Sequence, residues 1–175
     1  MSAPAPVWRS TLAQTGMELR LTWRRGENVL VTIVLPVVVL LFFSAVPLGP
    51  DDRGVTRLLP ATISLAIIAT GLVNLGIATG YERSYGVLKR LGGTPLPRFG
   101  LVGAKVLGVL AIEVVQVVLL VGIGLALGWR PGSGWSPALL LVSVVLGTAA
   151  FAGMGLAMAG RLRPEATMEI GRAHV

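Results

Sequence analysis

Residues 60–80 read PATISLAIIATGLVNLGIATG and contain no Asp, Glu, Lys or Arg; Asn74 is their only strongly polar side chain. A helix of about 20 apolar residues is long enough to cross the roughly 30 Å hydrocarbon core of a bilayer. This stretch therefore predicts a transmembrane helix, and it decides the fold class.

Three more apolar stretches of similar length flank it, at residues 29–46, 101–127 and 137–160. Hydrophobic residues make up 54% of the 175-residue chain and charged residues 13%, whereas soluble domains carry about 25% charged residues. This composition excludes an ordinary water-soluble globule. We expect an all-α polytopic transmembrane bundle with four spans, at about 29–46, 60–80, 101–127 and 137–160.

The first stretch contains Pro36. A kink is expected there, with the freed carbonyl satisfied by a neighbouring helix or by a hydroxyl such as that of Thr32. A cleavable signal peptide is the alternative. Against it, the stretch begins nearly thirty residues into the chain, is longer than the usual 7–15 residues of a signal peptide, and lacks a clear A-x-A site.

Lys and Arg are distributed unequally among the connections. Up to residue 169, ten lie before the first span, between the second and third, and after the fourth, whereas the other two connections hold three. Cytoplasmic loops retain positive charge. We therefore expect a multi-pass protein of the plasma membrane with its N-terminus in the cytoplasm.

Residues 8–25, WRSTLAQTGMELRLTWRR, are too polar to cross a bilayer but mix Trp, Leu, Met and Arg. Such a composition favours an amphipathic helix on the cytoplasmic membrane surface, broken or bent near Gly16. A disordered basic tail is the alternative.

Sites of enzymatic chemistry are not evident. The chain has no Cys, one His (His174), and no phosphate-binding loop or hydrolase motif. The net charge of +7 is spread over short segments beside the apolar stretches, which indicates membrane topology and not nucleic-acid binding. We expect no catalytic, metal or cofactor site in this chain.

Polar side chains inside the predicted spans are Asn74, Glu113 and Gln116. A carboxylate near the bilayer centre is costly unless it is paired, protonated or hydrated, so Glu113 should face protein or an aqueous cavity, with Gln116 one turn away on the same face. A substrate or proton role and a structural hydrogen bond between helices are both open. Lys105 is expected to snorkel to the interface.

Small residues indicate close helix packing. The candidates are Gly76 with Gly80, Gly124 with Gly128, and Gly147, Gly153, Gly155 and Gly160 in the last stretch.

The connection at residues 81–97 reads YERSYGVLKRLGGTPLP. Residues 82–91 can form a short helix that Gly92 and Gly93 end, followed by an extended exit at Thr94–Pro97. Its basic residues could contact lipid phosphates or a protein partner. The simpler alternative is a solvated basic loop that obeys the positive-inside rule.

This connection resembles the segment after the second span of type-2 ATP-binding-cassette (ABC) exporter permeases, including daunorubicin-resistance-like membrane components. The matching positions are Glu82, Arg83, Gly86, Leu88, Leu91, Thr94, Pro95 and Leu96. The resemblance implies that they form a coupling helix on a separate ATPase subunit, which holds the ATP and Mg²⁺.

The resemblance also implies a six-span permease that works as a dimer with a second copy or paralogue. Residues 1–169 would then be its N-terminal part. The implied function is export of an amphipathic drug, antibiotic, lipid or polysaccharide, with no enzymatic activity in the permease itself. A proton-coupled transporter using Glu113 and a membrane anchor or assembly protein are the rival functions.

The chain ends with EIGRAHV at 169–175, which resembles the translation of a common short-read sequencing adapter. Residues 170–175 are therefore expected not to be biological sequence, and the chain to be a fragment that stops in a cytoplasmic loop.

Overall fold

The computed structural model describes residues 6–24, 26–46, 54–86 and 97–161. Every regular element in these ranges is helical, as the apolar stretches predict. The elements are α1 (Val7–Arg24), α2 (Gly26–Ala45), α3 (Gly54–Ile68), the π-helix η1 (Ala69–Asn74), α4 (Leu75–Ser84), α6 (Arg98–Ala126) and α7 (Pro137–Arg161). The predicted all-α membrane bundle is confirmed. Residues 170–175 lie outside the described ranges.

Three helices are long and apolar enough to cross a membrane, namely Gly54–Ser84, Phe99–Ala126 and Pro137–Gly160. The first of these is one rod made of α3, η1 and α4, and it extends beyond the predicted 60–80 at both ends. The apolar part of α2, Leu30–Ala45, is shorter. All 20 residues of α2 together would span about 30 Å, so a crossing by α2 stays a prediction.

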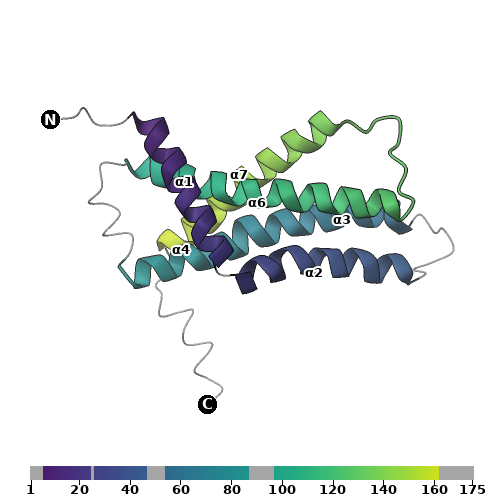
Figure 1. The fold of residues 1–175 in the computed structure, drawn as a ribbon, viewed down its shortest axis with the longest axis horizontal. Coiled ribbons are helices and arrows are strands. Elements are labelled where there is room, and N and C mark those ends of the chain that lie inside the picture. Colours follow the sequence, from purple (N-terminus) through teal and green to yellow (C-terminus); the bar gives the residue numbers. More distant parts are fainter. Residues whose placement is uncertain (1–5, 25, 47–53, 87–96, 162–175) are drawn as a thin grey trace, which may run out of the picture.

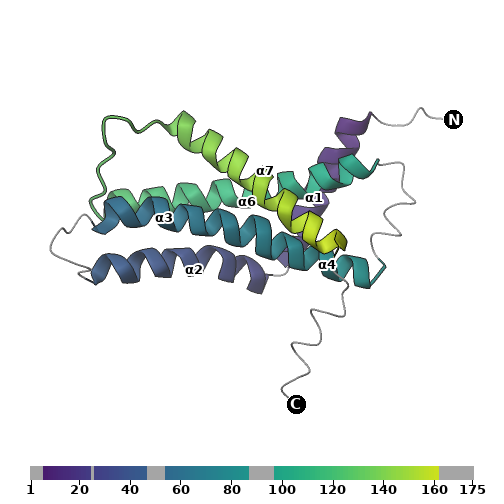
Figure 2. The ribbon, with the colours of Figure 1, turned by 180° about the vertical axis from the view of Figure 1, so that it is seen from behind.

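The rods α2, α3–α4 and α6 run side by side, and α7 crosses α6 and the α3–α4 rod obliquely (Figures 1 and 2). Helix α7 packs against η1 and α4, while α2 packs against α3. The buried core lies between α2, α3, α6 and α7, where branched side chains predominate: Leu40, Leu59, Ile63, Ile67, Val117, Leu120 and Val144. Apolar side chains on the outer faces, such as Leu139 and Leu146, remain exposed, as expected where lipid is the solvent.

Helix α1 crosses the end of α6 (Figure 1) and packs on it. Its exposed apolar side chains include Trp8, Leu12 and Trp23, whereas Glu18 and Thr15 turn toward α6. The helix predicted at 8–25 is therefore confirmed over Val7–Arg24, in place of a disordered tail. The break expected at Gly16 is wrong, because a helical glycine costs only about 1 kcal/mol and the contact with α6 holds the turns on both sides.

The turn of π-helix in the second span was not predicted. It lies where α7 approaches most closely: a Cβ on Gly155 would stand 2.7 Å from the carbonyl oxygen of Leu72, and one on Gly71 would stand 3.2 Å from the backbone nitrogen of Ala152. Only small residues allow two helices to come so near. The wider turn of η1 therefore forms part of the α7 contact.

The predicted glycine packing positions are confirmed in part. Gly76, Gly124, Gly147 and Gly155 each lie against another helix, whereas Gly80, Gly153 and Gly160 face open space. Gly128 has a different role, since its φ of +88° ends α6. The amide of Trp129 then donates to the carbonyl of Gly124 at 2.8 Å, which closes a Schellman motif.

Candidate functional site

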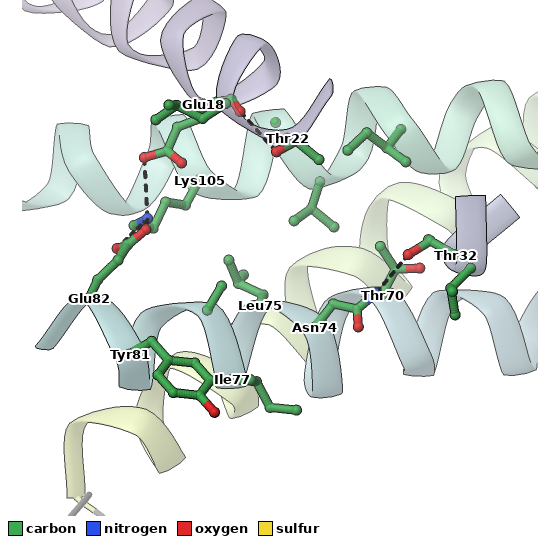
Figure 3. A pocket seen from close by; sticks show the side chains of 16 residues that line it. Glu18, Thr22, Thr32, Thr70, Asn74, Leu75, Ile77, Tyr81, Glu82 and Lys105 are labelled. Atoms are coloured by element: carbon green, nitrogen blue, oxygen red, sulfur yellow. Dashed lines mark hydrogen bonds and ion pairs between the residues drawn. The ribbon is translucent and has the colours of Figure 1, made fainter. Parts of the chain in front are cut away.

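Lys105 forms the centre of a partly buried ion triad with Glu18 of α1 and Glu82 of α4 (Figure 3). Its Nζ lies 2.7 Å from Glu82 Oε2 and 3.2 Å from Glu18 Oε1, and its side chain is only 6% exposed. The prediction that Lys105 snorkels outward is therefore wrong. Two carboxylates inside the protein offer the ammonium charge-assisted hydrogen bonds, so it turns inward.

Periodicity along α1 explains why Glu18 reaches the triad. Thr11, Thr15, Glu18 and Thr22 follow one another at intervals of three or four residues, so they share one face of the helix. This face lies on α6, where the Thr15 hydroxyl is 3.5 Å from the carbonyl of Ala104. A Cβ on Gly108 would lie 3.6 Å from the Cβ of Glu18, so the small residue in α6 lets α1 come close.

A cavity of about 540 Å³ opens beside the triad (Figure 3). It is bounded by α1, α2, the η1–α4 rod and α6. Its polar lining comes from Glu18, Thr22, Thr32, Thr70, Asn74, Tyr81, Glu82 and Lys105, and its apolar lining from Leu21, Val31, Leu75, Ile77, Ala78, Val109 and Ile112, with Gly108. The cavity thus has a charged end at the triad and a neutral polar end at η1.

Of the three polar residues predicted within the spans, Asn74 lines this cavity. Its Nδ2 donates to Thr32 Oγ1 at 3.0 Å and so joins η1 to α2. Glu113 and Gln116 do not line it. Two of the predicted site residues therefore line the cavity, Asn74 and, from the predicted coupling segment, Glu82.

Glu113 is 1% exposed and accepts a hydrogen bond from the Thr148 hydroxyl of α7. The other carboxylate oxygen has no hydrogen-bond partner among the described residues. Gln116, also fully buried, donates from Nε2 to the carbonyl of Thr32 at 2.7 Å. The two side chains therefore bind α7 and α2 respectively, although the sequence suggested one shared face.

The predicted coupling segment begins at the end of the α4 rod, where three of its eight matching positions are described, Glu82, Arg83 and Gly86. Glu82 belongs to the ion triad, and Arg83 donates from one guanidinium nitrogen to the last carbonyls of α7, those of Ala159 at 3.0 Å and Gly160 at 2.8 Å. Gly86 has a φ of +69°, a left-handed conformation that suits a residue without Cβ, and follows the end of α4 at Ser84.

The short helix predicted at 82–91 is therefore wrong at its start, because Glu82 and Arg83 complete the membrane rod and the helix ends before Gly86. The other predicted coupling residues lie outside the described ranges: Leu88, Leu91, Thr94, Pro95 and Leu96. Pro97 has an extended backbone, with ψ 154°, and α6 begins after it. The extended exit is thus confirmed at its last residue.

Sequence reasoning missed Glu18 and the inward role of Lys105. The three- and four-residue spacing of polar side chains in α1 could have indicated a polar face that packs on another helix. Chemically, the site can bind a polar or charged group through carboxylates, an ammonium group, hydroxyls and an amide. In addition, the triad and Arg83 link α1, α4, α6 and α7 mechanically at one end of the bundle.

Comparison with known proteins shows which family the chain belongs to. The sequence profile of the family described as "ABC-2 type transporter" matches residues 10–170. Two curated relatives, both named "Probable doxorubicin resistance ABC transporter permease protein DrrC", come from Mycobacterium tuberculosis strains CDC 1551 / Oshkosh and ATCC 25618 / H37Rv. Each is 31% identical over 147 residues, which cover 79% of this chain and 52% of the relative.

The chain therefore spans about half the length of the curated relatives it matches. No solved structure matches it significantly. The profile nevertheless covers nearly every helix described above, from α1 to α7. On this evidence, the chain belongs to the ABC-2 type transporter family.

Proposed function

We propose that the chain is part of the membrane subunit of an ATP-driven exporter, with residues 82–96 as the segment that contacts a separate ATPase. One observation carries this proposal. Glu82 and Arg83 are neighbours in sequence, yet Glu82 binds α6 and α1 through Lys105 and Glu18, whereas Arg83 binds the end of α7. A displacement of the segment would therefore be passed to three helices besides α4.

Such an attachment suits a subunit that converts movement of a partner into movement of the bundle. Packed helices and short ion pairs move as units, so a shift at the end of α4 would rotate α1, α6 and α7 together. We infer that ATP and Mg²⁺ bind the partner ATPase and that two permease copies or paralogues pair in the plasma membrane. In this orientation, the triad end of the bundle faces the cytoplasm.

The substrate we propose is an amphipathic molecule. A drug is the first class to test, because the names of both relatives state doxorubicin resistance; antibiotics, lipids and polysaccharides follow. The cavity supports an amphipathic substrate, since charged, neutral polar and apolar side chains share its wall.

ATP-driven uptake into inside-out proteoliposomes tests the proposal, with the complete permease and its ATPase reconstituted together. Replacing residues 87–96 by a Gly-Ser linker of equal length should abolish uptake while leaving membrane insertion normal. The matched control replaces residues 47–53, between α2 and α3, in the same way and should retain uptake. In addition, a cysteine at Leu88 should crosslink to the ATPase.

Three results would contradict this function. Uptake that persists after replacement of 87–96 would remove the role of the segment. Uptake driven by a proton gradient without ATP, and lost in Glu113→Gln, would favour the proton-coupled transporter instead. Crosslinking to lipid alone would favour a membrane anchor.

A further inference from the structure

The cavity beside the ion triad carries an unbalanced charge. Of its lining residues, Glu18 and Glu82 are acidic and Lys105 is basic, so two carboxylates face one ammonium group. All three side chains are largely withdrawn from solvent, with exposures of 19%, 24% and 6% respectively. A charge held in such surroundings is screened less than one on an open surface. The charged end of the cavity therefore attracts a second cation.

The rest of the cavity suits an elongated apolar body. Leu21, Val31, Val109 and Ile112 line it from three helices. Glu82 and Thr70 lie twelve positions apart on the same rod, which corresponds to about 18 Å along a helix. The volume of about 540 Å³ lies within the range of small-molecule sites.

The opposite end offers neutral hydrogen-bonding groups. Asn74 and Thr32 bond to each other across the cavity wall at 3.0 Å, and the Thr70 hydroxyl donates back to the carbonyl of Ala66 at 2.8 Å. These groups lie on or beside η1, and π-helical turns are frequent at functional sites. The cavity wall is thus negatively charged at the triad, apolar in the middle, and polar but uncharged at η1.

We propose that this cavity binds a cationic amphiphile, with its ammonium group on the carboxylate of Glu18, beside Lys105, and its apolar body along α2, α4 and α6. Glu18 is the primary counter-ion. Its Oε1 accepts from Lys105 and from Gln14, each at 3.2 Å, whereas Glu82 contacts Lys105 through both oxygens, at 2.8 and 2.7 Å. The ammonium group of Lys105 is thus bound more closely to Glu82 than to Glu18.

This proposal also names the charge of the exported substrate, since the bound cation would be that substrate. In this respect it rests on the proposed function. Glu82 begins the coupling segment, so an ammonium group at the triad changes the charge balance at the residue that joins the ATPase-facing segment to α6. Occupancy of the cavity would then stimulate the partner ATPase.

A matched pair of pyrene probes tests the site without the ATPase. Pyrenebutyl-trimethylammonium and pyrenebutyrate share an aromatic body and differ in the sign of the head group. Binding is measured by fluorescence anisotropy on the full-length permease in phosphatidylcholine nanodiscs, with empty nanodiscs subtracted. The cationic probe should bind at least about tenfold more tightly than the anionic one, the effect of one charge-assisted hydrogen bond.

Three variants separate the charge effect from a loss of folding. Glu18→Gln keeps an oxygen for Lys105 and should weaken the cationic probe about tenfold while leaving the anionic probe as weak as before or slightly stronger. Asp51→Asn removes the same charge from the connection between α2 and α3 and should leave both affinities unchanged. Ala78→Leu keeps every charge but fills part of the cavity, so it should weaken the cationic probe as well.

Equal binding of both probes, or unchanged binding of the cationic probe in Glu18→Gln and Ala78→Leu, would overturn the site. The ATPase measurement separates the two proposals. If the cationic probe binds tightly but leaves the ATP hydrolysis rate of the full complex unchanged, the binding site is supported and its role in transport is contradicted. If the complex takes up another substrate with ATP but does not bind the cationic probe selectively, the exporter function is supported and the proposed cation site is contradicted.

Discussion

Gln116 donates a hydrogen bond from Nε2 to the backbone carbonyl of Thr32, at 2.7 Å, and this is the carbonyl that Pro36 leaves without a helical donor. Proline at position i cannot donate to the carbonyl at i−4, so α2 has an open turn at Thr32. In hydrocarbon an unsatisfied carbonyl costs several kcal/mol. The fully buried Gln116 therefore compensates for Pro36 from another helix, as the sequence predicted for this proline.

This relationship predicts a thermodynamic coupling between Gln116 and Pro36. Gln116→Leu should lower the free energy of unfolding by about 1–3 kcal/mol, because it removes the hydrogen bond from Gln116 to the Thr32 carbonyl. In a Pro36→Ala background the same substitution should cost clearly less, since an alanine at that position restores the amide donor within α2. The measurement is a double-mutant cycle by SDS titration in mixed micelles. If Gln116→Leu lowers the free energy of unfolding equally with Pro36 and with Ala at position 36, then Gln116 does not compensate for the proline.

A second prediction concerns the close contact of α7 with η1. Gly155→Ala places a Cβ 2.7 Å from the backbone oxygen of Leu72, so one helix must shift, and we expect a loss of about 1–3 kcal/mol in unfolding free energy. Gly153→Ala is the matched control, because a Cβ there meets nothing within 4 Å. It should be neutral or slightly stabilising. Similar losses in both variants would mean that helix propensity, and not the contact, decides the effect.

These contacts also indicate how far the sequence could predict the fold. Hydropathy alone predicted the α3–α4 rod, α6 and α7, because length and apolar composition determine a span. Glycine spacing predicted that small residues pack, but not which ones, since Gly155 meets Leu72 while Gly153 points to open space. That choice depends on the rotation of α7 about its axis, which α7's nearly uniform apolar sequence does not specify.

The site was less predictable for a related reason. Lys105, in α6, and Glu82, at the end of α4, are 23 positions apart in sequence, and Glu18 comes from the surface helix. A lysine near a helix end satisfies the rule for snorkelling equally well whether or not carboxylates lie nearby. The inward turn of Lys105 depends on the α1–α6 contact, which is a tertiary feature. Asn74 could be identified because a lone amide in an apolar helix needs a partner whatever the packing.

The ion triad predicts strongly non-additive effects. Lys105→Met leaves the carboxylates of Glu18 and Glu82 facing each other without their cation, and we expect a loss of about 3 kcal/mol in unfolding free energy. The triple variant with Glu18→Gln and Glu82→Gln removes all three charges and should regain most of that loss. SDS titration of the single and triple variants checks this. A triple variant less stable than Lys105→Met would mean that the triad contributes by packing and not by charge.

The contact between Thr148 and Glu113 yields the last prediction, which also separates a structural from a transport role of the carboxyl group. Glu113→Gln retains an oxygen that can accept from Thr148, so it should change unfolding free energy by less than about 1 kcal/mol and preserve ATP-driven uptake. Thr148→Val removes the donor and should destabilise the bundle more than Glu113→Gln does, because the buried carboxyl loses that bond. Both variants are measured in parallel for stability and uptake. Lost uptake in Glu113→Gln at unchanged stability would contradict the structural role, because only a proton or substrate function needs the acid itself.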